Sequence, residues 1–415
     1  MKTTEAPDRP AEAAAPLIEA GTAAFRKMNL AMFVGGFATF ALLYALQPIL
    51  PRFAADFAVS ATTASLLFAA GTVAMAAMLI PASVLTDRFG RQEVMRASLA
   101  LAALIGLASA LATDFAQLLV LRLLLGGVLA GMPAAAMAYL GEEVAPNAQG
   151  RAMGLYIAGN ALGGMSGRLL AAVLTDLASW QIALAALGLM GVAAAIVFWR
   201  FLPDSRHFRP RTMGFGRVIG DAAMLLRDPG LRWLFLTGFL IMGAFASLYN
   251  YLGFRLHEPP FLLGQTAIGA MFVLYLLGSW SSAWAGRLVD RIGRRRVLWT
   301  MLVVCTTGLL VTLSNALVVV VVGVAVFTFG YFGAHSVASG WVGRRAGDRR
   351  ALASALYLCS YYIGSSTVGT LSGLAWEHGA WPGLVAALAL LLAASLVAAR
   401  ALGRIAPATA RAGTA

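Results

Sequence analysis

Twelve apolar stretches run along the chain, each long enough to cross a bilayer as a helix. Short polar segments separate them, and the longest interruption, 203–230, divides them into two groups of six. The predicted spans are residues 28–50, 62–85, 94–113, 117–140, 150–174, 180–202, 231–254, 265–288, 297–315, 317–340, 351–375 and 381–402. The pattern therefore predicts an all-α membrane protein with two six-helix bundles, 28–202 and 231–402.

The segments outside the bundles are expected to lie in the cytoplasm. Residues 1–27 are predicted to be a disordered tail that lacks the basic start of a cleavable signal peptide, and residues 403–415 a second tail. Residues 203–230 are predicted to link the bundles, with Val218 to Leu226 as a candidate interfacial helix.

Composition and charge support this interpretation. Hydrophobic residues make up 60% of the 415 and charged ones only 12%, while soluble domains carry roughly 25% charged residues. The net charge of +13 does not indicate nucleic-acid binding, because the basic residues lie in short clusters between apolar segments. With both termini inside, the outer loops contain only Arg52 and Arg255, and nearly all the other basic residues lie inside. This asymmetry predicts a multi-pass protein of the bacterial inner membrane with cytoplasmic termini.

The two halves repeat each other. The loop Asp87-Arg88-Phe89-Gly90-Arg91 recurs 203 residues later as Asp290-Arg291-Ile292-Gly293-Arg294. In the fifth and eleventh spans Gly163 matches Gly364 at an offset of 201. A consistent offset indicates a parallel duplication, which places a solute site near the membrane midplane between the halves.

These loops resemble the signature loop of the major facilitator superfamily, Gly-x-x-x-Asp-Arg-x-Gly-Arg-Arg/Lys. The second copy, which begins at Gly286, fits every position, whereas the first begins at Ser83 and ends at Gln92. The resemblance implies a conformational latch at Asp87, Arg88, Gly90, Arg91, Gly286, Asp290, Arg291, Gly293 and Arg294. The alternative is a plain basic turn that sets topology.

The fifth span carries glycines at helical spacing, Gly159, Gly163 and Gly167, which predict close helix packing. The stretch resembles the Gly-x-x-x-Gly-Pro-x-x-Gly-Gly element of twelve-helix drug:proton antiporters, but Gly164 replaces the proline and Arg168 the last glycine. Over its whole length the chain is most similar to the YnfM-like bacterial inner-membrane transporters. This resemblance implies an antiporter or efflux protein, although the two replacements weaken the inferred export direction.

Charged side chains inside the spans suggest the chemistry of the cargo. None of the acidic residues lies clearly within a span, whereas Arg122 and Arg168 do. A buried arginine is costly and by default faces the bundle interior, where it can hold a carboxylate or phosphate. Arg122 could instead snorkel to the outer surface. His335 is the only histidine within a span and is the candidate proton carrier, the alternative being a histidine hydrogen-bonded into helix packing.

Polar and aromatic side chains at similar depth complete the predicted cavity. Together with the two arginines and the histidine, the substrate-binding candidates are Asn160, Tyr44, Gln47, Tyr249, Asn250 and Tyr361. For the tyrosines the alternative is an interfacial belt.

The sequence thus predicts a secondary active transporter of a small organic solute, anionic or amphipathic, working by alternating access and coupled to protons. A proton-coupled multidrug or sugar exporter with an aromatic cavity is the alternative within the fold, and a membrane receptor or scaffold is the alternative outside it. No metal-ligand spacing or phosphate-binding glycine loop is present, so we expect no enzyme, cofactor or metal. The expected partners are a small molecule, protons and the lipid bilayer, with the protein acting as a monomer.

Overall fold

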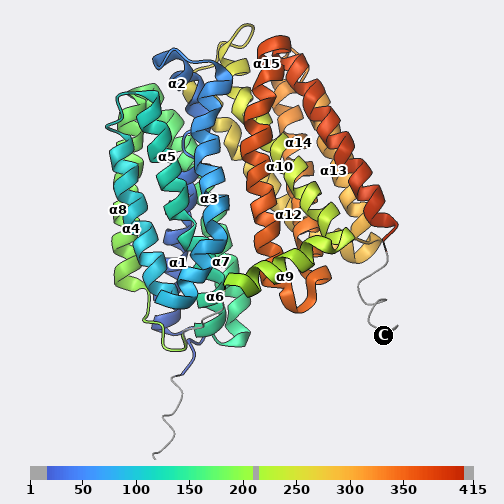
Figure 1. Ribbon diagram of the computed structural model, residues 1–415. Helices are drawn as coiled ribbons and strands as arrows, with labels where there is room; N and C mark the ends of the chain where they lie inside the picture. The colour runs from blue at the N-terminus through green and yellow to red at the C-terminus, as the bar shows by residue number, and fades with distance from the viewer. Residues whose placement is uncertain (1–15, 209–214, 406–415) are drawn as a thin grey trace, which may run out of the picture.

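A computed structural model of the protein describes residues 16–208 and 215–405, so most of the predicted tails and part of the linker lie outside it. Eight stretches are long and apolar enough to span a membrane, and one of them, Leu317–Gly403, contains three successive spans. Two further helices, α4 (Arg91–Ser109) and α13 (Arg294–Val311), begin with charged residues that lower their apolar content. Together these make the twelve predicted helices in two bundles (Figure 1).

The N-terminal bundle contains six spans. They are α1 (Ala23–Tyr44) continued by η1 (Gln47–Ile49) and α2 (Leu50–Asp56), α3 (Ala61–Phe89), α4, α5 (Phe115–Leu129) with α6 (Gly131–Glu143), α7 (Pro146–Leu177) and α8 (Trp180–Phe201).

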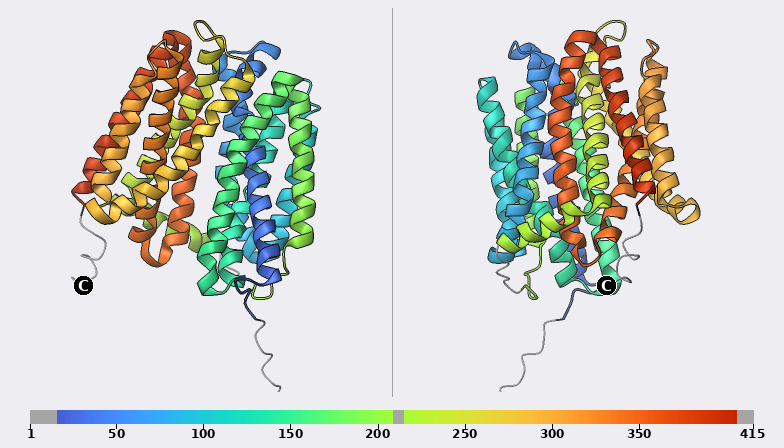
Figure 2. Two further views of the ribbon diagram at one scale, coloured as in Figure 1. Left: turned by 180° about the vertical axis from the view of Figure 1, so that it is seen from behind. Right: turned by 45° about the vertical axis from the view of Figure 1, so that its right-hand side comes forward.

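The C-terminal bundle repeats this order. Its spans are α10 (Pro229–His257), α11 (Gln265–Ala270) with η2 (Met271–Leu274) and α12 (Tyr275–Ile292), α13, α14 (Leu317–Ala346), and the two arms of α15 (Arg350–Gly403). The arms of α15 meet at a kink at Ala380, where φ is 47°. Figures 1 and 2 show the bundles side by side, with the helix axes of both roughly aligned.

The ends of the bundles differ in detail from the sequence prediction. The first span begins at Ala23, five residues earlier than predicted, because the Thr22 side chain caps the helix by accepting from Phe25 N. Just before it, Ile18 exchanges backbone hydrogen bonds with Glu143 and Ala145, so this part of the predicted tail is docked. The predicted interfacial helix corresponds to α9 (Phe215–Arg227), which lies across the inner side of the molecule (Figure 1).

Side-chain hydrogen bonds join the two bundles from the middle of the membrane outward. Thr72 and Ser366 bond at 2.8 Å, Gln47 donates to Asn250 at 2.8 Å, and Gln265 donates to the Pro48 carbonyl. In the described parts of the chain the innermost bond between the bundles is a weak one, from Cys359 Sγ to Ala76 O at 3.5 Å. The bundles are therefore fastened together on the outer side and not at the inner ends.

Two outer carboxylates complete this closure at equivalent places. Asp176, at the end of α7, accepts from both N and Oγ1 of Thr266, at 3.1 and 2.6 Å, where the eighth span begins. Glu377, 201 residues later, accepts from Thr62 N at 3.4 Å, where α3 begins. Each carboxylate thus caps a helix of the opposite bundle, where the helix dipole favours a negative charge.

Within the N-terminal bundle, α7 packs directly on the backbone of α1. A Cβ on Gly163 would lie 2.0 Å from Phe37 O, and one on Gly159 would lie 2.4 Å from Phe33 O. Gly167 lies equally close to Ala41, and Gly364 repeats the contact with Phe239 in the other bundle. Small residues here let the helices that carry the central side chains approach each other.

We predict that Gly163→Ala lowers the melting temperature of the purified protein, because overpacking a tight interface costs about 1–3 kcal/mol. Gly154→Ala on the same helix is the matched control, since a Cβ there meets nothing within 4 Å. The measurement is thermal unfolding in detergent. Equal melting temperatures for the two variants would contradict the packing described.

Candidate functional site

Arg168 lies between the two bundles on α7, with only 3% of its surface exposed. Its Nε donates to Gln47 Oε1 at 2.8 Å, and its Nη1 donates to the Gly164 carbonyl at 2.6 Å. In the part of the chain that the structure describes, none of the ion pairs involves this residue. The charge is therefore held by neutral groups alone.

Three aromatic rings surround the guanidinium. Its carbon lies 4.2 Å from the ring centre of Tyr44, 5.0 Å from that of Phe272 and 5.1 Å from that of Tyr275. Tyr44 comes from the N-terminal bundle and the other two rings from the C-terminal bundle. The Tyr275 hydroxyl is buried without a hydrogen-bond partner in the structure. We call Arg168, Tyr44, Phe272 and Tyr275 the arginine cage; its aromatic faces stabilise the cation.

A chain of hydrogen bonds runs from the cage across the interface. Gln47 donates to Asn250 Oδ1, and Asn250 Nδ2 donates in turn to the Gly369 carbonyl at 3.3 Å. Gln47 and Asn250 are 203 residues apart, and Arg168 and Gly369 are 201 apart, so both pairs occupy equivalent places in the halves. The amide pair therefore lies where the two repeats meet.

A second polar cluster lies in the C-terminal bundle, linked to the cage through Phe245, whose ring contacts both Tyr331 and Tyr275. His335 Nδ1 is 3.0 Å from the Tyr357 hydroxyl, and its ring centre is 4.9 Å from that of Tyr361. Tyr331 donates to the Tyr361 hydroxyl at 2.8 Å. Tyr249 bonds Thr328 at 2.7 Å and packs beside the cage. The predicted residues His335, Tyr249 and Tyr361 are thus brought together around one aromatic region.

Two predicted cavity residues lie outside the cage and this aromatic region. Arg122, 1% exposed, donates to the backbone carbonyls of Leu42 at 3.0 Å and Leu67 at 3.4 Å, and also to that of Leu43. It therefore joins α5 to α1 and α3 within one bundle. Asn160 lies two turns inward from Arg168, against Gly36 of α1.

In the signature loop of the N-terminal bundle, the charge of Arg91 is compensated by acidic residues of the same bundle. Gly90, with φ of 101°, ends α3 in a conformation that favours glycine. Arg91 pairs with Asp87 at 2.5 Å and with Glu142 at 3.1 Å, while Arg88 lies over the Phe89 ring.

The second signature loop has the same turn but different charges. Gly293 has φ of 84°, and a Cβ on Gly286 would meet open space. Asp290 makes no ion pair with any residue in the described ranges. The loop also contains Arg291 and Arg294, and two more arginines directly follow Arg294.

The prediction from sequence missed several members of the site. Phe272, Tyr275, Tyr331 and Tyr357 were not selected, although aromatic residues recur there at helical spacing, as in Tyr331/His335 and Tyr357/Tyr361. This spacing was the available signal. The packing of the two halves determines which bundle each ring faces. The sequence of a single helix does not contain this information.

Comparisons with known proteins agree with this architecture. The family model of the Major Facilitator Superfamily matches residues 32–284. The inner membrane transport protein YnfM of Escherichia coli is 43% identical over 92% of this chain and 91% of its own. The 3-(3-hydroxy-phenyl)propionate transporter of Escherichia coli is 29% identical over 54% of this chain and 55% of its own.

Among solved structures, a bacterial homologue of the human lysosomal transporter Spinster, inward-facing and occupied, superposes with a TM-score of 0.75 at 14% identity. The match covers 92% of this chain and 96% of that one. The fold is that of a polytopic secondary transporter. The chain belongs to the Major Facilitator Superfamily, and it is a multi-pass transporter of the bacterial inner membrane, not an enzyme.

We predict that Arg122→Ala lowers the melting temperature by several degrees, because each carbonyl left without its donor costs about 1–3 kcal/mol. The KM of any residual transport should stay unchanged, since the side chain bonds only backbone of its own bundle. Arg151→Ala, an exposed arginine, is the control. An unchanged melting temperature combined with a raised KM would assign Arg122 to the solute site instead.

Proposed function

We propose that the protein carries small organic anions, aromatic carboxylates above all, by alternating access, with Arg168 binding the anionic group. The observation that carries this proposal is a buried guanidinium between the bundles without an acidic partner. Arginine holds a carboxylate through two parallel, charge-assisted hydrogen bonds. A solute anion would supply the countercharge that the protein itself does not.

The surroundings of Arg168 favour an aromatic or amphipathic anion. The rings of the arginine cage offer apolar faces, and the unpartnered Tyr275 hydroxyl offers a further donor. A cationic drug would bring a second positive charge beside Arg168, which costs free energy at short range. The similarity to a 3-(3-hydroxy-phenyl)propionate transporter, over about half of the chain, supports the same class of solute.

A neutral hydrophobic solute is the second candidate. Next to the cage, Phe245 stacks on Tyr331 with ring centres 3.7 Å apart. Phe332 packs edge-on against Phe245, and the Tyr275 ring lies tilted beside it. Such a cluster suits a multidrug or sugar exporter, because aromatic faces bind many apolar groups. The charge of Arg168 favours the anion.

For alternating access, we propose that the described arrangement is the inward-open state. The bonds between the bundles lie in the middle and outer parts of the membrane, where Asp176 and Glu377 each cap the opposite bundle. Opening to the outside requires these caps to break. For proton coupling, His335 is the proposed carrier, because its titratable imidazole lies within the aromatic region, against Tyr331 and Tyr361.

We predict saturable flux of aromatic carboxylates into proteoliposomes, driven by an imposed pH gradient. Arg168→Gln should raise KM about tenfold or more, because a charge-assisted hydrogen bond contributes about 1.5–3 kcal/mol. Arg168→Lys should recover part of the loss, since it keeps the charge without the bidentate geometry.

Arg151→Gln on the same helix is the matched control and should behave as wild type. Saturable exchange of organic cations that survives Arg168→Gln would overturn the anion proposal. Absence of gradient-driven flux for every solute would contradict the coupling to protons.

We also predict that Asp176→Ala combined with Glu377→Ala shifts the protein toward an outward-open state. Each lost cap weakens the outer closure by about 1 kcal/mol, or about fivefold in population. The measurement is the distance between spin labels on the outer loops at Thr113 and Glu258, with Cys305 and Cys359 replaced by serine.

Asp114→Ala is the matched control, because Asp114 accepts from Gln117 N within its own bundle at 2.8 Å. An equal change of distance in the control, or no change in the double variant, would contradict the role given to the caps.

A further inference from the structure

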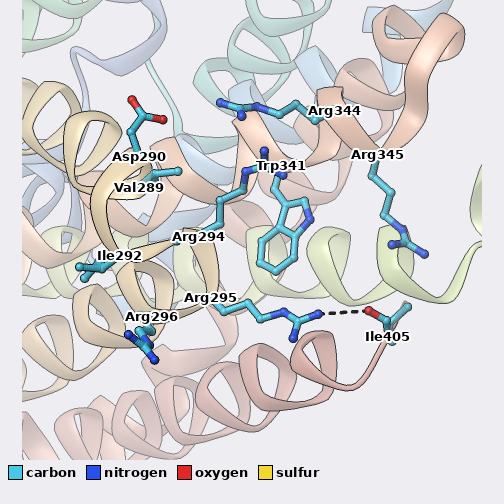
Figure 3. A pocket seen from close by; sticks show the side chains of 11 residues that line it. Val289, Asp290, Ile292, Arg294, Arg295, Arg296, Trp341, Arg344, Arg345 and Ile405 are labelled. Atoms are coloured by element: carbon cyan, nitrogen blue, oxygen red, sulfur yellow. Dashed lines mark hydrogen bonds between the residues drawn. The ribbon is translucent and has the colours of Figure 1, made fainter. Parts of the chain in front are cut away.

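A cavity rich in arginine lies on the inner side of the C-terminal bundle, away from the arginine cage. Its volume is about 600 Å³, and it is formed by the turn between α12 and α13, the inner end of α14 and Ile405. Figure 3 shows its arginines arranged around Trp341. The arginines are Arg294, Arg295, Arg296, Arg344 and Arg345.

The positive charge of this cavity is poorly compensated. Asp290 is the acidic residue that lines it, and Arg345 is bound by Asp228 at 2.6 and 3.0 Å. Arg295 donates to the Ile405 carbonyl at 3.2 Å, which leaves its charge in place. In the described parts of the chain, Arg294, Arg296 and Arg344 form no ion pair.

The equivalent place in the N-terminal bundle is close to neutral. At the offset of 203, the five cavity arginines correspond to Arg91, Gln92, Glu93, Gly141 and Glu142. There Arg91 pairs with Glu142 at 3.1 Å, whereas their counterparts Arg294 and Arg345 are both positive. Both sets of positions lie on the inner side of the membrane. Membrane topology alone therefore does not require arginine at all five positions of the C-terminal set.

The cavity's place in the membrane indicates the kind of anion that fits it. Guanidinium groups bind phosphate through paired hydrogen bonds, and basic pockets on the cytoplasmic side attract anionic headgroups. Ile292 lines the cavity and is 40% exposed, and Trp299, one turn beyond Arg295, is 44% exposed. These apolar surfaces lie beside the cavity at the inner boundary of the bilayer, where an acyl chain can run along them.

We propose that this cavity binds the phosphate headgroup of an anionic phospholipid of the inner leaflet. The headgroup is held by Arg295, Arg296 and Arg344, while Arg345 stays with Asp228. The lipid docks the C-terminal bundle to the inner leaflet, and the N-terminal bundle has no equivalent site because its acids replace the arginines.

The experiment is native mass spectrometry of the delipidated full-length protein, titrated with phosphatidylglycerol or with phosphatidylcholine. The variant Arg295→Gln/Arg296→Gln/Arg344→Gln should bind phosphatidylglycerol at least fivefold more weakly than wild type. Binding of phosphatidylcholine should not change. The matched control, Arg151→Gln/Arg200→Gln/Arg206→Gln, removes three exposed arginines from the inner side of the other bundle and should bind as wild type.

Equal phosphatidylglycerol binding by the two triple variants would overturn the proposal. Displacement of the lipid by millimolar inorganic phosphate would also overturn it, in favour of a site for a free phosphate anion. Should the cavity triple variant not fold, Arg296→Gln alone, at an exposed position, is expected to weaken lipid binding about twofold. No loss in that variant would count against the site.

Discussion

The structure depends on how the buried positive charge between the two bundles is accommodated. Arg168 lies where the two bundles meet, and no carboxylate of the described chain pairs with it. A buried charge without partners is unfavourable by several kcal/mol, so it must be hydrogen-bonded and surrounded by polarisable groups. Gln47, the Gly164 carbonyl and three aromatic rings meet this need. Because the rings come from both bundles, the contacts that stabilise this charge depend on how the two halves pack.

The two repeats have kept their mechanical parts and diverged in their charges. The outer caps Asp176 and Glu377, and the tight glycines Gly163 and Gly364, occur in both halves. In contrast, Arg168 has Gly369 as its counterpart, and Glu142 has Arg345. The two bundles are therefore alike in scaffold but chemically different at the centre of the molecule and on its inner side.

The sequence predicted the fold well because its signals are local and repeated. Apolar run length and the distribution of arginines are sufficient for twelve spans and for the orientation, and the doubled Asp-Arg-x-Gly-Arg loop indicates the superfamily. The site was predictable only in part. Arg168, Gln47 and Asn250 can be selected as polar groups within spans, but their hydrogen-bonded order depends on packing between segments about 120 to 200 residues apart.

The different roles of the two buried arginines could not be predicted from the sequence either. From sequence, Arg122 and Arg168 are both cavity candidates, since each is a lone cation in an apolar helix, and snorkelling is the alternative for Arg122. Their roles separate only when the neighbouring backbone is known. Arg122 meets three carbonyls of its own bundle, whereas Arg168 faces the partner bundle. Tyr275 was missed because nothing near it in sequence distinguishes a cage ring from a ring that faces lipid.

In the proposed function, Arg168 recognises a negative charge on the solute. The most direct test is equilibrium binding of an aromatic carboxylate and of its primary amide, which are nearly equal in size and differ in charge. We expect the carboxylate to bind the purified protein at least about tenfold more tightly, and Arg168→Gln to abolish this preference. Equal affinity for acid and amide in the wild-type protein, or a preference that persists in Arg168→Gln, would contradict it.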